Sequence, residues 1–245
     1  MQDCPVELAI LLPIHNEAGN IEPLVSKLRR VAADLEVGGM AVVLIDDGST
    51  DESAREIDDL VALSSENICV RHERNLGYGA TVRNGIAALE QINPRWAMLM
   101  DADGTMDPAG IGKFRERILA GDDLVIGCRY GDVNPLDYPF WRKTISWVGS
   151  LICRLGFGLR LQDFTLGMRA FTYDAARNWS LQSDTFAILL EMVFQALRNS
   201  NVVSNVPITY MGRSGGTSKF RYRPQLVAEY LRYAWQARLW RMSRP

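Results

Sequence analysis

The feature that most restricts how this chain can fold is a series of short apolar runs that alternate with stretches of helical spacing. Runs with strand character lie at residues 7–14, 41–45, 68–71, 96–100 and 124–128, and helical spacing is found at 21–35, 51–63 and 77–91. Strands that are apolar along their whole length are buried on both faces, as in a parallel sheet covered by helices. We therefore predict an α/β fold with a Rossmann-like, mostly parallel sheet and helices on both faces.

Polar clusters follow four of these runs, and they read HNE, DDGS, DAD and GCRY. In sheets of this kind, ligands bind beyond the carboxyl ends of the strands. The four clusters are therefore expected to meet at one edge of the sheet, and their convergence indicates a binding site more strongly than any one of them does.

The cluster Asp101-Ala102-Asp103 is the strongest candidate for a metal site. Two carboxylates one residue apart can share a divalent cation such as Mg²⁺ or Mn²⁺, which prefers oxygen ligands and bridges diphosphates. The alternative is a capping turn, because Asp-Gly and Asp-Pro are common turn formers. The position of the pair directly after an apolar strand, with other acids at neighbouring strand ends, favours the metal site.

The clusters at the first two strand ends suggest a nucleoside pocket. One of Asp46 and Asp47 can cap the next helix, which leaves the other free to accept hydrogen bonds from a base or ribose. No GxGxxG motif follows the first strand, which argues against NAD binding. His15 lies in this region and either stacks on a base or fills the turn, whereas His72 is expected at the surface; neither is predicted to be catalytic.

The second half of the chain is less regular. Helices are expected at 141–155, 185–199 and 225–240, a loop and strand at 162–171, and a strand at 202–210. Basic residues after the core sheet are either a solvated face or contacts to diphosphate and phosphate. The segment from Arg213 to Lys219 is the most suggestive, because its glycines expose backbone N–H groups between two cations.

Composition limits the classes of function. The net charge of −2 gives no basic field for nucleic acid. The four cysteines (Cys4, Cys69, Cys128 and Cys153) form no CxxC pair, which argues against a zinc site or disulfide framework and for a reducing compartment. We find neither a signal peptide nor an apolar stretch of about 20 residues that would span a membrane.

The C-terminal segment is basic and rich in aromatic residues, with seven Lys or Arg from Lys219 onward and a single acid, Glu229. Such a helix can lie on an anionic membrane surface, with its aromatic rings at the level of the headgroups. The alternative is a helix that packs on the core through Leu226, Leu231 and Leu239, and both can hold together. We predict a single domain over residues 1–220, followed by a basic amphipathic helix over 221–245.

Taken together, the motifs resemble those of the family 2 glycosyltransferases, and most closely the dolichol- or polyprenol-phosphate mannosyltransferases and their glucosyl relatives. The matching segments cover roughly residues 6–220 and read, in order, LLPIHNEAGNI, LIDDGSTDES, NLGYGATVRNGI, LMDADGTMDP, GCRY, WRKTIS, QDFTLGMRAF and PITYMGRSGGTSKF. The resemblance implies a GT-A fold and an inverting transfer that depends on Mg²⁺ or Mn²⁺.

The resemblance also assigns residues to the site. It implies a donor pocket lined by Pro13, His15, Glu17, Ile45, Asp47, Asp101, Ala102, Asp103, Arg129, Arg213 and Lys219. The metal would be held by Asp101 and Asp103, and the catalytic residues would be Asp103, Asp163, Arg129 and Arg142, with Arg142 facing the lipid phosphate and Asp163 near the acceptor. His15 and Thr105 depart from the usual mannosyltransferase residues, which leaves the base and the sugar open.

The expected activity is transfer of a hexose, with mannose favoured over glucose, from a nucleotide-diphosphate sugar to a polyprenyl phosphate. A phosphate acceptor hardly needs a general base, whereas a sugar hydroxyl would require Asp163 to remove a proton. The alternatives are a carbohydrate or small-molecule acceptor, a nucleotidyltransferase, and a non-catalytic nucleotide-sugar binding protein. We expect a cytoplasmic protein that is peripheral at the cytoplasmic face of a membrane, on its own, through an anchoring partner, or as a homo-oligomer.

Overall fold

The computed structural model describes residues 6–129, 140–209, 211 and 224–243, and the side chains of 140–148 are not described. Its strands are β1 (Leu8–Ile14), β2 (Met40–Asp46), β3 (Asn67–Arg71), β4 (Trp96–Leu99), β5 (Leu124–Cys128), β6 (Arg169–Thr172) and β7 (Val203–Pro207). Its helices are α1 (Ile21–Asp34), α2 (Ser53–Leu63), α3 (Tyr78–Ile92), the 3₁₀ turn η1 (Pro108–Gly110), α4 (Ile111–Leu119), α5 (Phe140–Phe157), α6 (Tyr173–Ala176), α7 (Ile188–Arg198) and α8 (Pro224–Met242).

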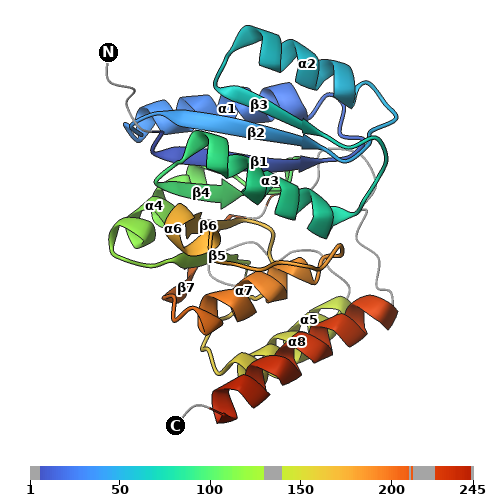
Figure 1. The fold of residues 1–245 in the computed structure, drawn as a ribbon, viewed down its shortest axis with the longest axis vertical. Helices are drawn as coiled ribbons and strands as arrows, with labels where there is room; N and C mark the ends of the chain where they lie inside the picture. The colour runs from blue at the N-terminus through green and yellow to red at the C-terminus, as the bar shows by residue number, and fades with distance from the viewer. Residues whose placement is uncertain (1–5, 130–139, 210, 212–223, 244–245) are drawn as a thin grey trace.

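The strands form one mixed sheet in the order β3-β2-β1-β4-β6-β5-β7. All the neighbouring pairs are parallel except those of β6, which is antiparallel to both β4 and β5. Helices cover both faces of the sheet (Figure 1). The predicted mostly parallel α/β fold is therefore confirmed.

Burial explains why the apolar runs become central strands. β2 is buried at every position and β1 at all but one. Along β1, Leu8, Ile10 and Leu12 join the core cluster that includes α1 and α4, while Ala9 and Leu11 join the one that includes α3 and α7. Because successive side chains of a strand point to opposite faces, a strand between two helical layers must be apolar throughout.

Helix α8 packs side by side with α5, at the end of the molecule that is farthest from α2 (Figure 1). The helices approach closely at Gly156, where an added Cβ would lie 2.5 Å from the carbonyl oxygen of Ala234. The buried face of α8 consists of Leu226, Tyr233, Ala234 and Ala237. The expected packing through Leu231 and Leu239 is wrong, because both are 48% exposed.

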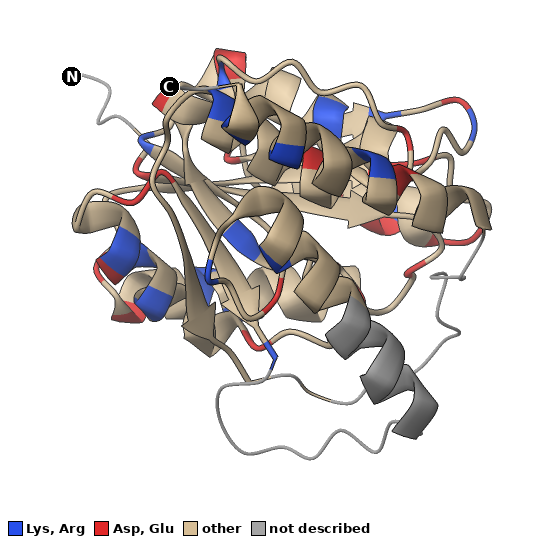
Figure 2. Ribbon diagram, turned by 90° about the horizontal axis from the view of Figure 1, so that it is seen from below, with Lys and Arg blue, Asp and Glu red and all other residues tan. Residues whose placement is uncertain are grey.

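The outward side of α8 also carries apolar side chains, since Val227, Leu231, Trp235, Leu239 and Met242 are exposed. Arginines mark the same helix in Figure 2, where they are blue, and Glu229 is its one acid. In the part of the chain that the structure describes, no helix is long and apolar enough to cross a membrane.

Candidate active site

Hydrogen bonds join the polar loops after β1 and β2. His15 Nδ1 lies 2.9 Å from the carbonyl oxygen of Asp47, and the backbone N–H of Glu17 donates to Ser53 Oγ at 2.9 Å. Pro13, His15 and Glu17 are all half-buried. The structure therefore brings together the residues that sequence motifs assigned to a nucleoside pocket, at the carboxyl edge of the sheet.

The carboxylate of Asp47 is not free, contrary to expectation. It is 4% exposed and accepts hydrogen bonds from the backbone N–H groups of Leu76 (2.7 Å) and Gly77 (3.1 Å). Its third partner is His72 Nδ1, at 2.8 Å. Asp46 is also engaged, by the backbone N–H of Ser49 and by the side chain of Arg71. As the side chain lies, Asp47 fixes the loop before α3 rather than offering an open acceptor.

The surface position expected for His72 is wrong. The residue is 9% exposed, and its ring is held between Asp47 and Asn84, whose Nδ2 lies 2.8 Å from Nε2. A histidine at a strand end carries no local signal of burial, because its partners come from the loop after β2 and from α3.

Two further residues assigned to the donor pocket belong to the core. Ile45 is fully buried, and its Cδ1 would lie 2.9 Å from a Cβ added at Gly85 of α3. Ala102 is 2% exposed. The side chain of Ile45 therefore packs against α3, and the assignment of both residues to the donor pocket stays a prediction.

Asp101 lies opposite a glycine that the motif analysis did not single out. β4 and β6 pair antiparallel with Leu99 opposite Arg169, so the register continues beyond the strands with Asp101 opposite Gly167. A Cβ added at Gly167 would lie 2.8 Å from both carboxylate oxygens of Asp101. The phenol of Tyr78 donates to Asp101 Oδ1 at 3.0 Å.

Asp103 follows on a turn and is anchored by Thr105, whose backbone N–H and Oγ1 lie 3.1 Å and 2.6 Å from Asp103 Oδ1. Among the described residues, no group of three or more ligating side chains could hold a metal by itself. Two carboxylates suit a hard cation that completes its shell with substrate phosphates and water. The acids thus fit a Mg²⁺ or Mn²⁺ shared with a diphosphate.

Asp163 and Arg129 form a buried ion pair. Arg129 Nε donates to Asp163 Oδ2 at 2.8 Å, and Nη2 lies 3.3 Å from Oδ1. The backbone N–H and Oγ1 of Thr165 also donate to Asp163 Oδ1, at 2.9 Å and 3.1 Å. The Asp163 side chain is 1% exposed, and that of Arg129 is 21% exposed. The arrangement holds the guanidinium in one orientation at the end of β5.

Arg169, the first residue of β6, is a second buried cation and is completely shielded from solvent. Its guanidinium donates to the carbonyl oxygens of Phe164, Leu166 and Leu189. Burial lowers its pKa to about 10, and the carboxylates of Asp163 and Asp101 act in the opposite direction. Arg169 therefore stays protonated at neutral pH. Its hydrogen bonds to Phe164 and Leu166 fix the loop of residues 163–168, which carries Asp163 and passes beside Asp101 at Gly167.

Three predicted site residues are not placed. Arg213 and Lys219 lie outside the described residues, and Arg142 falls in the part of α5 whose side chains are not described. Their roles stay predictions.

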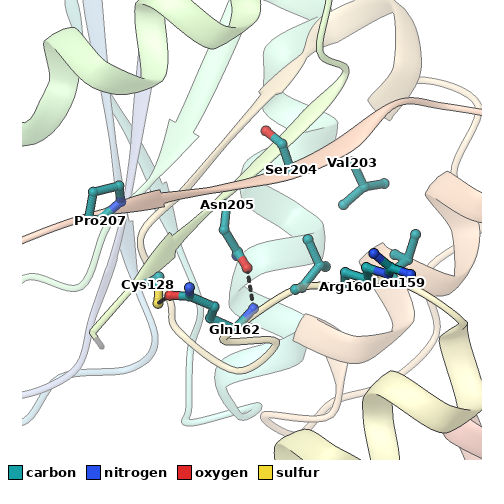
Figure 3. A pocket seen from close by; sticks show the side chains of 9 residues that line it. Cys128, Leu159, Arg160, Gln162, Val203, Ser204, Asn205 and Pro207 are labelled. Atoms are coloured by element: carbon teal, nitrogen blue, oxygen red, sulfur yellow. Dashed lines mark hydrogen bonds between the residues drawn. The ribbon is translucent and has the colours of Figure 1, made fainter. Parts of the chain in front are cut away.

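A cavity of about 560 Å³ lies between β7 and the segment that follows α5 (Figure 3). Its lining includes Cys128, Arg160, Gln162 and Asn205, and none of the predicted site residues. Asn205 accepts a hydrogen bond from the backbone N–H of Gln162 at 2.6 Å and donates to the carbonyl oxygen of Asp163 at 3.1 Å. The cavity thus lies next to the loop that carries Asp163, to which Asn205 is hydrogen-bonded.

Sequence reasoning missed Tyr78, Gly167 and Arg169. Both the Gly-Tyr-Gly and the Leu-Gly-Met-Arg strings stand inside the motif segments quoted above, so their positions were visible. Their contacts were not visible, because these join segments that are distant in the chain. Tyr78 of α3 reaches the loop after β4, and Gly167 is brought there by the antiparallel pairing of β6 with β4.

Comparison with known proteins finds relatives that are named as a mannosyltransferase and as a phosphomannose synthase. The chain is 29% identical over 221 residues to undecaprenyl-phosphate mannosyltransferase of Micrococcus luteus, covering 85% of each chain. It is 26% identical over 225 residues to polyprenol monophosphomannose synthase of Mycolicibacterium smegmatis, covering 86% of this chain and 79% of the relative.

Among solved structures, glucosyl-3-phosphoglycerate synthase from Mycobacterium tuberculosis, in complex with Mn²⁺, UDP and phosphoglyceric acid, has the same fold. The TM-score is 0.67 at 16% identity, over 94% of this chain and 78% of the other. The family model described as glycosyl transferase family 2 matches residues 9–183, more than half of the chain. The chain is therefore a glycosyltransferase that belongs to family 2.

Proposed function

We propose that this glycosyltransferase moves a hexose, mannose before glucose, from a nucleotide-diphosphate sugar to a polyprenyl phosphate with inversion at the anomeric carbon. The names of the relatives support a polyprenyl phosphate acceptor and favour mannose. The predicted metal-binding acids support a donor that carries a diphosphate.

The choice of a phosphate acceptor rests on the hydrogen bonds that the Asp163 carboxylate already accepts. Its buried carboxylate accepts four hydrogen bonds, from Arg129 and Thr165, and is badly placed to take a proton. A sugar hydroxyl must lose a proton to become a good nucleophile, whereas a phosphate is already anionic at neutral pH. The engaged carboxylate thus favours a phosphate acceptor and gives Asp163 the task of orienting Arg129.

In the proposed reaction, an oxygen of the acceptor phosphate forms a bond to the anomeric carbon as the bond to the β-phosphate oxygen breaks. The nucleoside diphosphate leaves with the electron pair, and no proton is transferred. Asp101 and Asp103 would hold Mg²⁺ or Mn²⁺, which stabilises the charge on the leaving diphosphate when it is bound. Arg129, Arg142, Arg213 and Lys219 are predicted to add positive charge around the two phosphate groups.

The experiment that tests this function measures transfer of radiolabelled hexose from GDP-mannose, and in parallel from UDP-glucose, to a short polyprenyl phosphate with Mn²⁺ or Mg²⁺. Metal-dependent, organic-extractable product supports the proposal, and the active donor names the sugar. Donor hydrolysis without lipid product would indicate that the acceptor is a carbohydrate or another small molecule.

Gly167→Ala is expected to weaken metal binding without unfolding the protein. The new Cβ would lie 2.8 Å from both oxygens of Asp101 and 3.0 Å from the Tyr78 hydroxyl, so the carboxylate must turn away. Displacing a ligand of this kind should raise the half-saturating Mn²⁺ concentration about ten-fold or more. Gly110→Ala is the matched control, because its Cβ would meet only side-chain carbons of Met168 and Ile208, at ordinary distances of 3.5 Å and 3.9 Å. An unchanged Mn²⁺ requirement in Gly167→Ala would contradict the assigned ligand.

We further propose that the outer faces of α5 and α8 rest on the cytoplasmic face of a membrane, where the lipid acceptor is found. Leu151, Ile152 and Leu155 of α5 are exposed, as are the apolar side chains of α8 described above. The charged residues of α8 are three arginines and Glu229. Exposed apolar side chains with positive charge suit an anionic lipid surface.

Leu231→Ser combined with Trp235→Ser is expected to reduce binding to vesicles that contain anionic lipid about ten-fold, because two apolar side chains no longer enter the interface. Sedimentation with vesicles measures the bound fraction. Leu63→Ser on α2 is the control, since Leu63 is 81% exposed and lies on another part of the molecule. Equal binding by the double variant and the control would show that α8 does not contact the membrane.

A further inference from the structure

Tyr78, the first residue of α3, contacts Asp101 and Phe186 but has no role in the proposed reaction so far. Its hydroxyl donates to Asp101 Oδ1 at 3.0 Å. Its ring stacks on Phe186, with the ring centroids 4.3 Å apart and an interplanar angle of 16°. A phenol carries its proton at neutral pH, so Tyr78 is a hydrogen-bond donor to Asp101.

The segment that carries Phe186 is fixed at several points. The carboxylate of Glu191 accepts hydrogen bonds from the backbone N–H groups of Gln182 (3.0 Å) and Ser183 (2.9 Å). Arg83 of α3 donates to Asp184 Oδ1 at 2.7 Å. Thr185 Oγ1 donates to Glu229 of α8. Because α3, α7 and α8 all hold this segment, the ring of Phe186 is a rigid surface for Tyr78.

Glycines on both sides of Tyr78 allow the start of α3 to lie close to the backbone of residues 183–185. The backbone N–H of Gly79 donates to the carbonyl oxygen of Asp184 at 3.0 Å. A Cβ at Gly79 would lie 2.2 Å from the carbonyl oxygen of Ser183, and one at Gly77 would lie 2.5 Å from that of Asp184. Gly77 also has a φ of 98°, which L-residues with side chains rarely adopt. The Gly-Tyr-Gly string thus seats the tyrosine against Phe186 and beside Asp101.

We propose that Tyr78 is a positioning residue, which orients the carboxylate of Asp101 for the divalent cation while Phe186 holds its ring in place. The inference rests on the proposed metal-dependent function. Groups that hydrogen-bond to metal ligands set the orientation of those ligands, and their loss typically costs 10–100-fold in metal affinity or activity. A purely structural tyrosine would affect stability and leave the metal requirement unchanged.

Tyr78→Phe is the direct test, because it removes the hydroxyl and keeps the ring on Phe186. Mn²⁺ is titrated into protein saturated with GDP or UDP, and its dissociation constant is measured by calorimetry. We expect Mn²⁺ to bind at least about ten-fold more weakly, with a melting temperature lowered by no more than about 4 °C. In the transfer assay, half-saturating Mn²⁺ should rise similarly, while kcat at saturating Mn²⁺ stays within about three-fold.

Two further variants make the result specific. Phe186→Leu should also weaken Mn²⁺ binding, since the ring of Tyr78 loses its support. Tyr173→Phe on α6, the control, should match wild type. Wild-type Mn²⁺ affinity in Tyr78→Phe, with normal metal binding by the unaltered protein, would overturn this inference alone. Failure of the unaltered protein to bind Mn²⁺ with either nucleotide would instead overturn the metal-dependent function and this inference with it.

Discussion

Replacing Asp103 by alanine is expected to lower hexose transfer at least about a thousand-fold, because the cation would lose one of its two protein ligands. A loss of that size corresponds to about 4 kcal/mol of transition-state stabilisation, a reasonable share of what a metal contributes to a charged leaving group. Asp103 is anchored through Oδ1 by Thr105, so its carboxylate is held ready before substrate arrives. The measurement is kcat/KM for the active donor across a Mn²⁺ titration.

Asp107→Ala provides a matched control from the same loop. Its carboxylate forms an ion pair with Lys27 at 2.9 Å and caps the short turn at Ala109. Surface ion pairs contribute little, so this variant should keep activity within a few-fold of wild type. If Asp103→Ala also stayed within ten-fold at every Mn²⁺ concentration, Asp103 would not be a metal ligand.

The second large effect is expected at Asp163, where two substitutions separate stability from chemistry. Asp163→Ala removes the partner of Arg129 and should cost about 3 kcal/mol of folding free energy, at the lower end for a broken buried pair because Arg129 retains some exposure. Asp163→Asn keeps an oxygen for the Thr165 donors and should lower turnover by no more than about ten-fold. Removal of a true general base would cost about 10²–10⁴-fold.

Urea unfolding and the transfer assay measure the two effects independently. Asp174→Asn serves as the control, because Asp174 pairs with Arg177 at a distance of 3.3 Å with both side chains largely exposed, and its loss should change stability by less than about 0.5 kcal/mol. A hundred-fold loss of turnover in folded Asp163→Asn would assign proton removal to this residue. The acceptor would then be a hydroxyl compound rather than a phosphate.

Most of the fold could be predicted from local pattern. The apolar runs at 7–14 and 41–45 became β1 and β2 with bounds within one residue, because burial on both faces leaves no room for polar side chains. The helices at 21–35 and 77–91 were likewise placed closely. The acids at strand ends fell at one edge because parallel strands put their carboxyl ends together.

The site was only partly predictable. The motifs pointed to Asp101 and Asp103, but the neighbours of Asp101 come from residues 78 and 167. The register of β6 places Gly167, and a four-residue strand carries no signal of its direction or its partners, while Tyr78 comes from α3. One of Asp46 and Asp47 was expected to be free, yet both carboxylates accept hydrogen bonds, that of Asp47 from His72, Leu76 and Gly77.

The sequence by itself determined the layered α/β architecture, the edge at which the acids gather, and the family, because these follow from local periodicity and contiguous motifs. The tertiary structure alone decided that β6 enters the sheet antiparallel, that Asp47 and His72 are buried together, that Tyr78 reaches Asp101, and that α8 leaves several large apolar side chains exposed. Each of these depends on contacts between segments distant in the chain, and the packing free energy that selects among them is a property of the whole molecule rather than of any short segment.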